Sequence, residues 1–185
     1  MRVSPAPALD ILDQLSAGIA RRLGVSCHVT TDEFDATFAM DGARRQTYST
    51  AVLARLAQAP LPEGIAVLGV TEADLYVPVL TFVFGEAQMP GRAALVSLHR
   101  LREEYYGLPP NPRQLEERLL KEALHELGHT QGLRHCDDWR CVMVSSHAVE
   151  KLDLKEAEFC AACRRHLARN NIRAKPSPKR WGGLF

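Results

Sequence analysis

The sequence has no long hydrophobic run. No window approaches about 18 uncharged apolar residues, the length that a helix needs to cross a bilayer. The start of the chain also lacks the continuous apolar stretch that follows the basic residues of a secretory signal. We therefore expect a cytoplasmic protein that makes no membrane contact.

Acidic residues are absent from the end of the chain. None follows Glu158, although the 185-residue chain has a net charge of only +1. The basic residues of this segment are Arg164, Arg165, Arg169, Arg173, Lys175, Lys179 and Arg180. A basic tail can bind nucleic acid or an anionic surface, but no aromatic residues alternate with these charges, and Trp181 follows the last of them. We interpret the segment as a solvated helix face that leads into a flexible end at 175–185, and we do not expect nucleic-acid binding.

The overall composition is that of a folded protein. Hydrophobic residues make up 46% and charged residues 24%, which allows a core of ordinary size. The length suits one domain. We expect a monomer with a single domain over residues 1–174, in which 1–132 hold a sheet and a long helix and 133–174 form a C-terminal part.

Hydrophobic periodicity predicts the order of the helices and strands. Apolar residues at helical spacing indicate helices over residues 8–23, 47–58 and 154–171. Apolar runs between turn residues indicate strands over 25–30, 65–70, 80–87 and 93–99. A further helix should begin at Pro112, with Asn111 as its cap, and end before Gly132. This order predicts an α/β domain, on the border of α+β, with a mixed sheet.

Three histidines at the end of that long helix have metal-binding spacing. His125 and His129 lie four residues apart, so both imidazoles project from one helix face and can reach one ion. Gly132 can adopt a positive φ, and the resulting turn lets His135 approach the same ion. Three histidines leave a fourth position for water, as in a catalytic zinc site. The alternative is a set of surface histidines on an amphipathic helix, against which the added Gly132 and His135 argue.

Glu126 is the candidate catalytic residue. It lies about 100° around the helix from His125, so it is badly placed as a ligand but can reach a zinc-bound water. Zinc lowers the pKa of such a water to about 7, and a carboxylate can then take its proton and pass it to the leaving amine. We expect the apolar face of this helix to pack on the core, and the histidine face, with Arg118 and Glu122, to open into a cleft.

Four cysteines form a second candidate metal site, and they are Cys136, Cys141, Cys160 and Cys163. Their pattern, C-x4-C, a gap of 18 residues, then C-x2-C, is close to that of structural zinc sites. Four thiolates leave no open position, so we predict a structural zinc that ties the loop after His135 to the last helix. The alternatives are two disulfides, which a reducing cytosol disfavours, or four unrelated buried cysteines. Cys27 is left over and should pack as a small apolar residue.

The string His-Glu-x-x-His-x-x-Gly-x-x-His, followed by Met143, resembles the metzincin zinc peptidases. Cys136, directly after the motif, and the other three cysteines narrow the resemblance to the archaemetzincins. The resemblance covers roughly residues 65–167, including the stretches 81–85 and 106–112. It implies a metzincin-like, twisted mixed sheet with a long active-site helix and a C-terminal helical part. It also implies that Met143 forms an apolar floor beneath the zinc.

Two functional hypotheses follow. The first is a zinc metallopeptidase with two zinc ions per chain, one catalytic and one structural, which hydrolyses peptide bonds in small peptides. The alternative is a non-catalytic zinc-binding protein that presents a surface to a partner. Glu126 favours the first hypothesis, because a purely structural three-histidine site needs no carboxylate at that position.

Three features bear on the substrate. In the metzincin plan residues 80–87 lie along the cleft, where they would either bind an extended peptide by strand addition or form a plain sheet edge. We expect Tyr105 and Tyr106 to pack rather than to line the cleft. No tyrosine follows Met143, where some metzincins carry one that assists the transition state. We therefore expect weak activity on folded proteins.

Overall fold

The computed structural model describes residues 1–169. The flexible end expected at 175–185 and the last residues of the predicted domain lie outside this range. Within it, no helix combines the length and the apolar character that crossing a membrane requires.

Helices and strands alternate along the described chain. The helices are α1 (Leu9–Leu23), α2 (Ser49–Leu56), α3 (Pro112–Thr130), α4 (Val149–Leu154) and α5 (Ala161–Arg169), with short 3-10 turns η1 (Thr37–Ala39), η2 (His99–Leu101) and η3 (Glu103–Tyr106). The strands are β1 (Arg2–Val3), β2 (Glu33–Phe34), β3 (Met40–Asp41), β4 (Gln46–Tyr48), β5 (Val67–Thr71), β6 (Leu75–Tyr76), β7 (Gly85–Ala87) and β8 (Ala93–Ser97).

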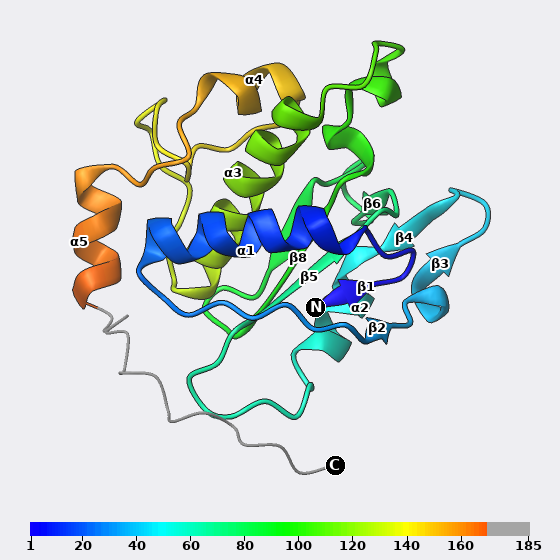
Figure 1. Ribbon diagram of the computed structural model, residues 1–185, viewed down its shortest axis with the longest axis horizontal. Helices are drawn as coiled ribbons and strands as arrows, with labels where there is room; N and C mark the ends of the chain where they lie inside the picture. Colours follow the sequence, from blue (N-terminus) through cyan, green and yellow to red (C-terminus); the bar gives the residue numbers. More distant parts are fainter. Residues whose placement is uncertain (170–185) are drawn as a thin grey trace.

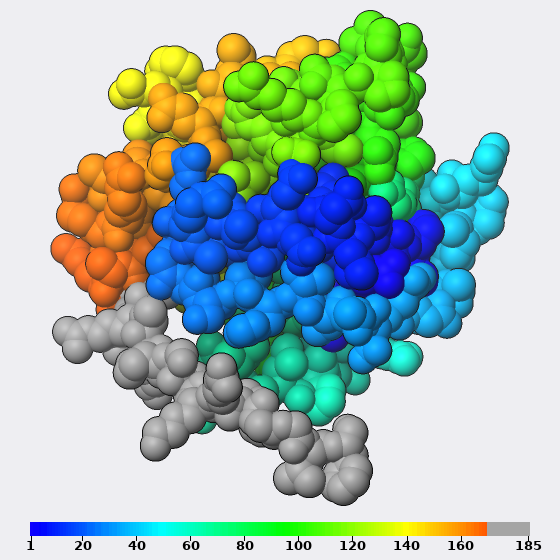
Figure 2. All heavy atoms as spheres, in the orientation of Figure 1, coloured from blue at the N-terminus to red at the C-terminus, as the bar shows by residue number. Residues whose placement is uncertain are grey.

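The larger sheet is mixed, as the sequence predicts. Its strand order is β2-β1-β5-β8-β7, and every neighbouring pair is parallel except β7 and β8. The antiparallel strand β7 therefore forms one edge, with Gly85 opposite Val96 and Ala87 opposite Ala94. A smaller sheet of β3, β4 and β6 lies beside it, and its β3–β4 hairpin projects from one side of the molecule (Figures 1 and 2).

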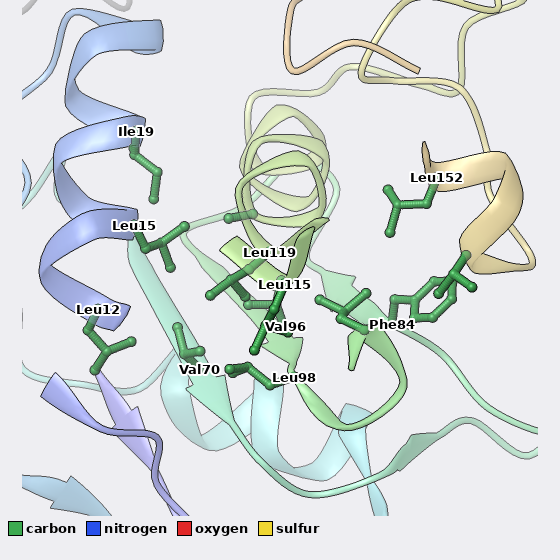
Figure 3. Packing of buried hydrophobic residues seen from close by; sticks show 13 residues of the cluster. Leu12, Leu15, Ile19, Val70, Phe84, Val96, Leu98, Leu115, Leu119 and Leu152 are labelled. Carbon is green, nitrogen blue, oxygen red and sulfur yellow. The ribbon is translucent and has the colours of Figure 1, made fainter. Parts of the chain in front are cut away.

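Helices cover both faces of the larger sheet. Strand β8 is buried along its whole length, and its alternate residues face opposite layers. Val96 belongs to a core cluster with α1, α3 and α4, whereas Leu95 packs with α2. Figure 3 shows Leu12, Leu15 and Ile19 of α1 directed toward α3 and the sheet, with Phe84 and Leu152 on the far side of α3.

Helix α3 forms where the sequence predicts it. The Asn111 side chain accepts a hydrogen bond from Gln114 N at 3.2 Å, and Pro112 occupies the first turn. The helix ends at Thr130, and Gly132 has a φ of +81°. Because L side chains rarely adopt this φ, glycine allows the sharp turn that follows the helix.

Residues 25–30 do not form the predicted strand. Their side chains alternate as expected, because Val25, Cys27 and Val29 are half-buried and the residues between them are exposed. Within residues 1–169, however, no strand pairs with this backbone. Alternating burial shows that one side of a segment packs on the core. The segment forms a strand only if its backbone also hydrogen-bonds to a neighbouring strand.

The helix predicted at 154–171 is confirmed only in part: α4 ends at Leu154, α5 begins only at Ala161, and residues 170–171 lie outside the described range. Between the two helices the backbone pairs with the loop around Cys141. Glu156 N donates to Arg140 O at 2.9 Å, and Val142 N donates to Glu158 O at 2.8 Å. A continuous helix would lose these bonds.

Other predicted elements are shorter. Residues 47 and 48 of the helix predicted at 47–58 belong to β4, and α2 ends at Leu56. Of the strand predicted at 80–87 only Gly85–Ala87 pairs with β8, and the strand predicted at 93–99 ends at Ser97.

Candidate metal centres

The structure brings the three histidines of the motif together. The Nε2 atoms of His125 and His129 lie 3.1 Å apart. One ring nitrogen of each histidine, His135 included, lies within 4.8 Å of the others. Tetrahedral ligands at about 2.0–2.1 Å from zinc lie about 3.4 Å from one another, so small side-chain adjustments suffice to place all three around one ion.

Backbone carbonyl groups orient two of these rings. His125 Nδ1 hydrogen-bonds Val142 O at 2.8 Å, and His129 Nδ1 hydrogen-bonds Leu133 O at 2.7 Å. Since a carbonyl oxygen only accepts, each Nδ1 carries the proton and each Nε2 offers a lone pair to the shared centre. Burial lowers the pKa of His125 well below its usual value, and the nearby Lys155 cation adds to this. The imidazole is thus neutral, as metal binding requires.

The centre is open on one side. His125 is buried, His129 is half-buried and His135 is exposed. The turn at Gly132, in which Leu133 N donates back to Gly128 O at 3.1 Å, brings His135 to the centre from outside the helix. A small molecule can therefore approach from the His135 side.

Met143 packs against α3 at Gly128, the residue before His129. It is fully buried. A Cβ at Gly128 would overlap the Met143 sulfur and come within 3.2 Å of Phe159. No local pattern in the sequence marks Gly128, yet the helix can approach Met143 this closely only because the position lacks a side chain.

Glu126 is buried beside the edge strand β7. A Cβ at Gly85 would lie 2.7 Å from Glu126 Cγ and 2.9 Å from Oε1. No local sequence pattern marks this position of Gly85 either. Burial raises the pKa of Glu126 well above its usual value; Glu122 and Glu86 raise it further, and Lys155 opposes them. A buried carboxyl with a raised pKa is a stronger base than a solvated one.

The histidine face of α3 does not open into a cleft along its whole length, contrary to the sequence prediction. Arg118 is buried and donates to both carboxylate oxygens of Asp153, at 2.8 and 2.7 Å. Glu122 is buried too, 3.2 Å from Lys155 Nζ, which also donates to Val144 O at 3.2 Å. The segment after Met143 and helix α4 supply these partners and cover the helix here, so only the histidine end remains accessible.

The four cysteines also converge. Their sulfur atoms all lie within 4.8 Å of one another, with Cys136 and Cys160 at 3.8 Å and Cys141 and Cys163 at 3.8 Å. A disulfide needs about 2.05 Å between sulfurs, so neither pair is bonded. Cys27 is not part of this group.

Cys160 directly precedes α5, where the first N–H groups of a helix lack intrahelical partners. Hydrogen bonding from the backbone N–H of Cys163 lowers the pKa of Cys160 to about 7. Burial raises the pKa of Cys163 and of Cys136. A thiol cluster with one readily ionised member and no fifth ligand fits a closed metal site.

One tripeptide joins the two centres. Cys141 belongs to the cysteine cluster, the Val142 carbonyl oxygen accepts from His125, and Met143 packs against Gly128, next to His129. Cys136 N also donates to Met143 O at 3.0 Å. An ion bound by the four cysteines would therefore also position Met143 and the imidazole ring of His125.

Comparison with known proteins finds similar sequences and similar structures. Residues 59–169, which include all seven candidate ligands, match the model of peptidase family M54. The archaemetzincin of Methanocaldococcus jannaschii is 42% identical over 175 residues, which cover 93% of this chain and 96% of that protein.

Solved structures are similar over most of their length. The crystal structure of the Methanopyrus kandleri archaemetzincin matches with a TM-score of 0.75 at 38% identity, covering 92% of this chain and 94% of that one. A zinc-dependent peptidase from Methanocorpusculum labreanum matches with a TM-score of 0.78 at 30% identity, covering 86% and 94%. The metzincin-like fold expected from the sequence is thereby confirmed.

Proposed function

Because the chain belongs to peptidase family M54, the archaemetzincins, and is thus a zinc metallopeptidase, we propose that it hydrolyses peptide bonds in small peptides with Glu126 as the general base. The position of Glu126 carries this proposal: a buried carboxylate follows His125 directly and lies against the edge strand β7.

The residues of both centres suit zinc. In the histidine centre, the Nε2 atoms of His125 and His129 point to one place because their Nδ1 atoms are held by carbonyl groups, and His135 completes the set. Zinc bound there supplies a Lewis acid that lowers the pKa of a water molecule to about 7. The four cysteines would hold a second, structural ion. All seven ligands come from one chain, so we propose two zinc ions per monomer.

The protein's own part in the reaction is to move a proton and to orient the substrate. Glu126 takes the proton of the attacking water and delivers it to the leaving amine nitrogen. Strand β7 offers a place for the peptide, because within residues 1–169 no strand pairs with its outer edge. An extended peptide that pairs there passes Gly85, next to Glu126. The non-catalytic alternative is not retained, since family membership supports an enzyme.

The test compares the wild type with Glu126→Gln on a mixed peptide library, with cleavage sites read by mass spectrometry. The glutamine keeps the size of the side chain and removes the base. We expect the variant to retain its zinc and its fold and to cleave about 100- to 10,000-fold more slowly, the usual contribution of a general base. Equal rates for two zinc-loaded proteins would overturn the proposal.

A further inference from the structure

Strand β7 has one free edge, and that edge is short. At the two ends of the strand, Phe84 O and Gln88 N bond to β8, at 2.8 and 3.0 Å. In an antiparallel pair, residues that bond to the partner alternate with residues whose N–H and C=O groups point away from it. Gly85 and Ala87 therefore direct their backbone groups outward. In the described part of the chain, no strand pairs with them on that side.

Contacts on its other sides hold the strand in place without covering this edge. The Glu86 carboxylate accepts a hydrogen bond from Thr50 Oγ1 of α2 at 2.8 Å. In the turn that follows β7, Gly91 N donates to Thr130 O at the end of α3 at 3.0 Å. All three residues of β7 are half-buried. A strand that is already rigid loses little conformational freedom when a peptide pairs with it.

The same edge is occupied two residues before Gly85. Val83 pairs antiparallel with Leu75 of β6, and Val83 N donates to Leu75 O at 2.9 Å. Leu75 is fully buried and pairs with Thr47 of β4 on its other side, so β6 is held between two partners. Neighbouring strands lie about 4.8 Å apart, so a peptide beside Val83 would need the place that β6 occupies. The free edge therefore covers Gly85 to Ala87 and stops before Val83.

Glu126 relates this edge to the cleaved bond. A Cβ added at Gly85 would lie 2.9 Å from Glu126 Oε1, so the carboxylate lies directly beside the strand at this residue. A general base acts on the reacting group at hydrogen-bond distance or through one water molecule. Under the proposed function, the peptide residue opposite Gly85 therefore borders the cleaved bond.

The direction of the peptide decides which of its sides is restricted. Antiparallel pairing gives the more stable hydrogen bonds, and an antiparallel peptide runs from Ala87 past Gly85 toward Val83. Its amino-terminal side then lies along the free part of the edge. Both chains advance by about 3.4 Å per residue, so the second residue after the one opposite Gly85 reaches Val83 and meets β6. The sheet thus has room for no more than about two residues on the carboxyl side of the cleaved bond.

We propose that the protein cleaves peptides close to their carboxyl end and releases no more than about two residues, because β6 closes the edge beyond them. This inference rests on the proposed peptidase function and names its substrate class. Residues added on the amino side of the cleaved bond pair with Ala87, and each backbone hydrogen bond gained there should raise kcat/KM by about 2- to 10-fold. Residues added on the carboxyl side must leave the sheet or break the bridge between Val83 and Leu75.

The test uses acetylated peptides built around one bond that the wild type cleaves in the mixed library. The reference peptide has about four residues before that bond and two after it, as the length of the free edge suggests. A peptide with a single residue before the bond cannot reach Ala87 and should show a kcat/KM about 5- to 100-fold lower, the loss of two hydrogen bonds. A peptide with two further residues at the carboxyl end should show a kcat/KM about 2- to 10-fold lower than the reference, the loss of one.

A binding measurement separates the edge from the chemistry. Zinc-loaded Glu126→Gln keeps the edge strand and lacks the base. Calorimetry should rank the three peptides in the same order of affinity as the kcat/KM values of the wild type. An affinity that does not fall when the carboxyl end is extended would show that β6 does not limit binding, and would overturn the inference.

The failure of this inference can be told apart from the failure of the proposed function. A wild type that cleaves internal bonds as readily as the last two bonds of a peptide overturns the inference and leaves the proposed function standing. So does a carboxyl extension that leaves kcat/KM unchanged or raises it. Cleavage confined to the first two bonds would place the closed side at the amino end and also overturns the inference. A wild type that cleaves no peptide overturns the proposed function and this inference together.

Discussion

The histidine centre and the cysteine centre lie in one stretch of chain, but they are built in opposite ways. Two histidines project from a regular helix, and the third, His135, is exposed and leaves one side open. Cys136 and Cys141 lie in the loop after α3, Cys160 directly precedes α5 and Cys163 lies in its first turn, and none of the four is exposed. Helix α3 gives the open centre its geometry, whereas the closed centre joins the loop after α3 to the start of α5. Under the proposed function, the open histidine centre would bind the reacting water and the closed cysteine centre would stabilise the fold.

Because of the tripeptide Cys141-Val142-Met143, the histidine centre depends on the cysteine centre more than the cysteine centre depends on it. The tripeptide serves the cysteine cluster at one end and the histidine centre at the other. Damage to the cysteine centre should therefore spread to the histidine centre, whereas loss of metal from the histidine centre should remain local.

The largest expected effect comes from removing the closed centre. In Cys160→Ser/Cys163→Ser we expect the loss of the structural zinc and unfolding of residues 133–169. Because His135 lies in this segment, zinc binding at the histidine centre should weaken as well. Structural zinc contributes about 10–16 kcal/mol in zinc-finger peptides, more than the net stability of most domains. Zinc analysis and circular dichroism measure both effects. Cys27→Ser is the matched control and should keep both ions. A double variant that stays folded with its zinc content unchanged would contradict the structural role of the cysteine centre.

A smaller effect should follow from replacing Lys155, whose ammonium group links Glu122 of α3 to the Val144 carbonyl oxygen without a metal ion. Lys155→Met leaves Glu122 buried without its partner, which typically costs about 3–5 kcal/mol. Denaturant unfolding measures the change. Zinc content should stay the same, since no candidate ligand is altered. Lys155→Met/Glu122→Leu, which removes both charges, should recover most of the loss. If the double variant is no more stable than the single one, the ion pair is not the cause.

The smallest effect concerns the contact between Gly128 of α3 and Met143. Gly128→Ala forces Met143 and Phe159 to move, an overpacking that costs about 1–3 kcal/mol. The better helix propensity of alanine offsets about 1 kcal/mol of this. We expect a net loss of about 1 kcal/mol in thermal unfolding together with reduced peptide cleavage. Gly42→Ala, where nothing lies within 4 Å of the added Cβ, is the control. A stabilised Gly128→Ala with full activity would show that Met143 is not closely fitted.

The sequence predicts what depends on local spacing. The start of α3 follows from Asn111 and Pro112, and the clusters of histidines and cysteines follow from their intervals along the chain. Contacts between distant segments have no such signal. Nothing local shows that Gly85 must admit Glu126, or that Gly128 must admit Met143. A lysine is ordinarily exposed, so the burial of Lys155 against Glu122 could not be predicted from the sequence. For the same reason, the sequence does not show that this face of α3 is covered.

Stepwise removal of zinc with a mild chelator tests most directly whether the histidine centre is catalytic and the cysteine centre structural. Zinc release, far-ultraviolet circular dichroism and peptide cleavage are followed in the same samples. The histidine centre has neutral ligands and an open side, so it should lose its ion first. We predict that cleavage disappears with the first zinc while the circular dichroism spectrum stays unchanged, and that unfolding accompanies the second. Cooperative unfolding with the first zinc, or cleavage that persists until the second is lost, would contradict the account.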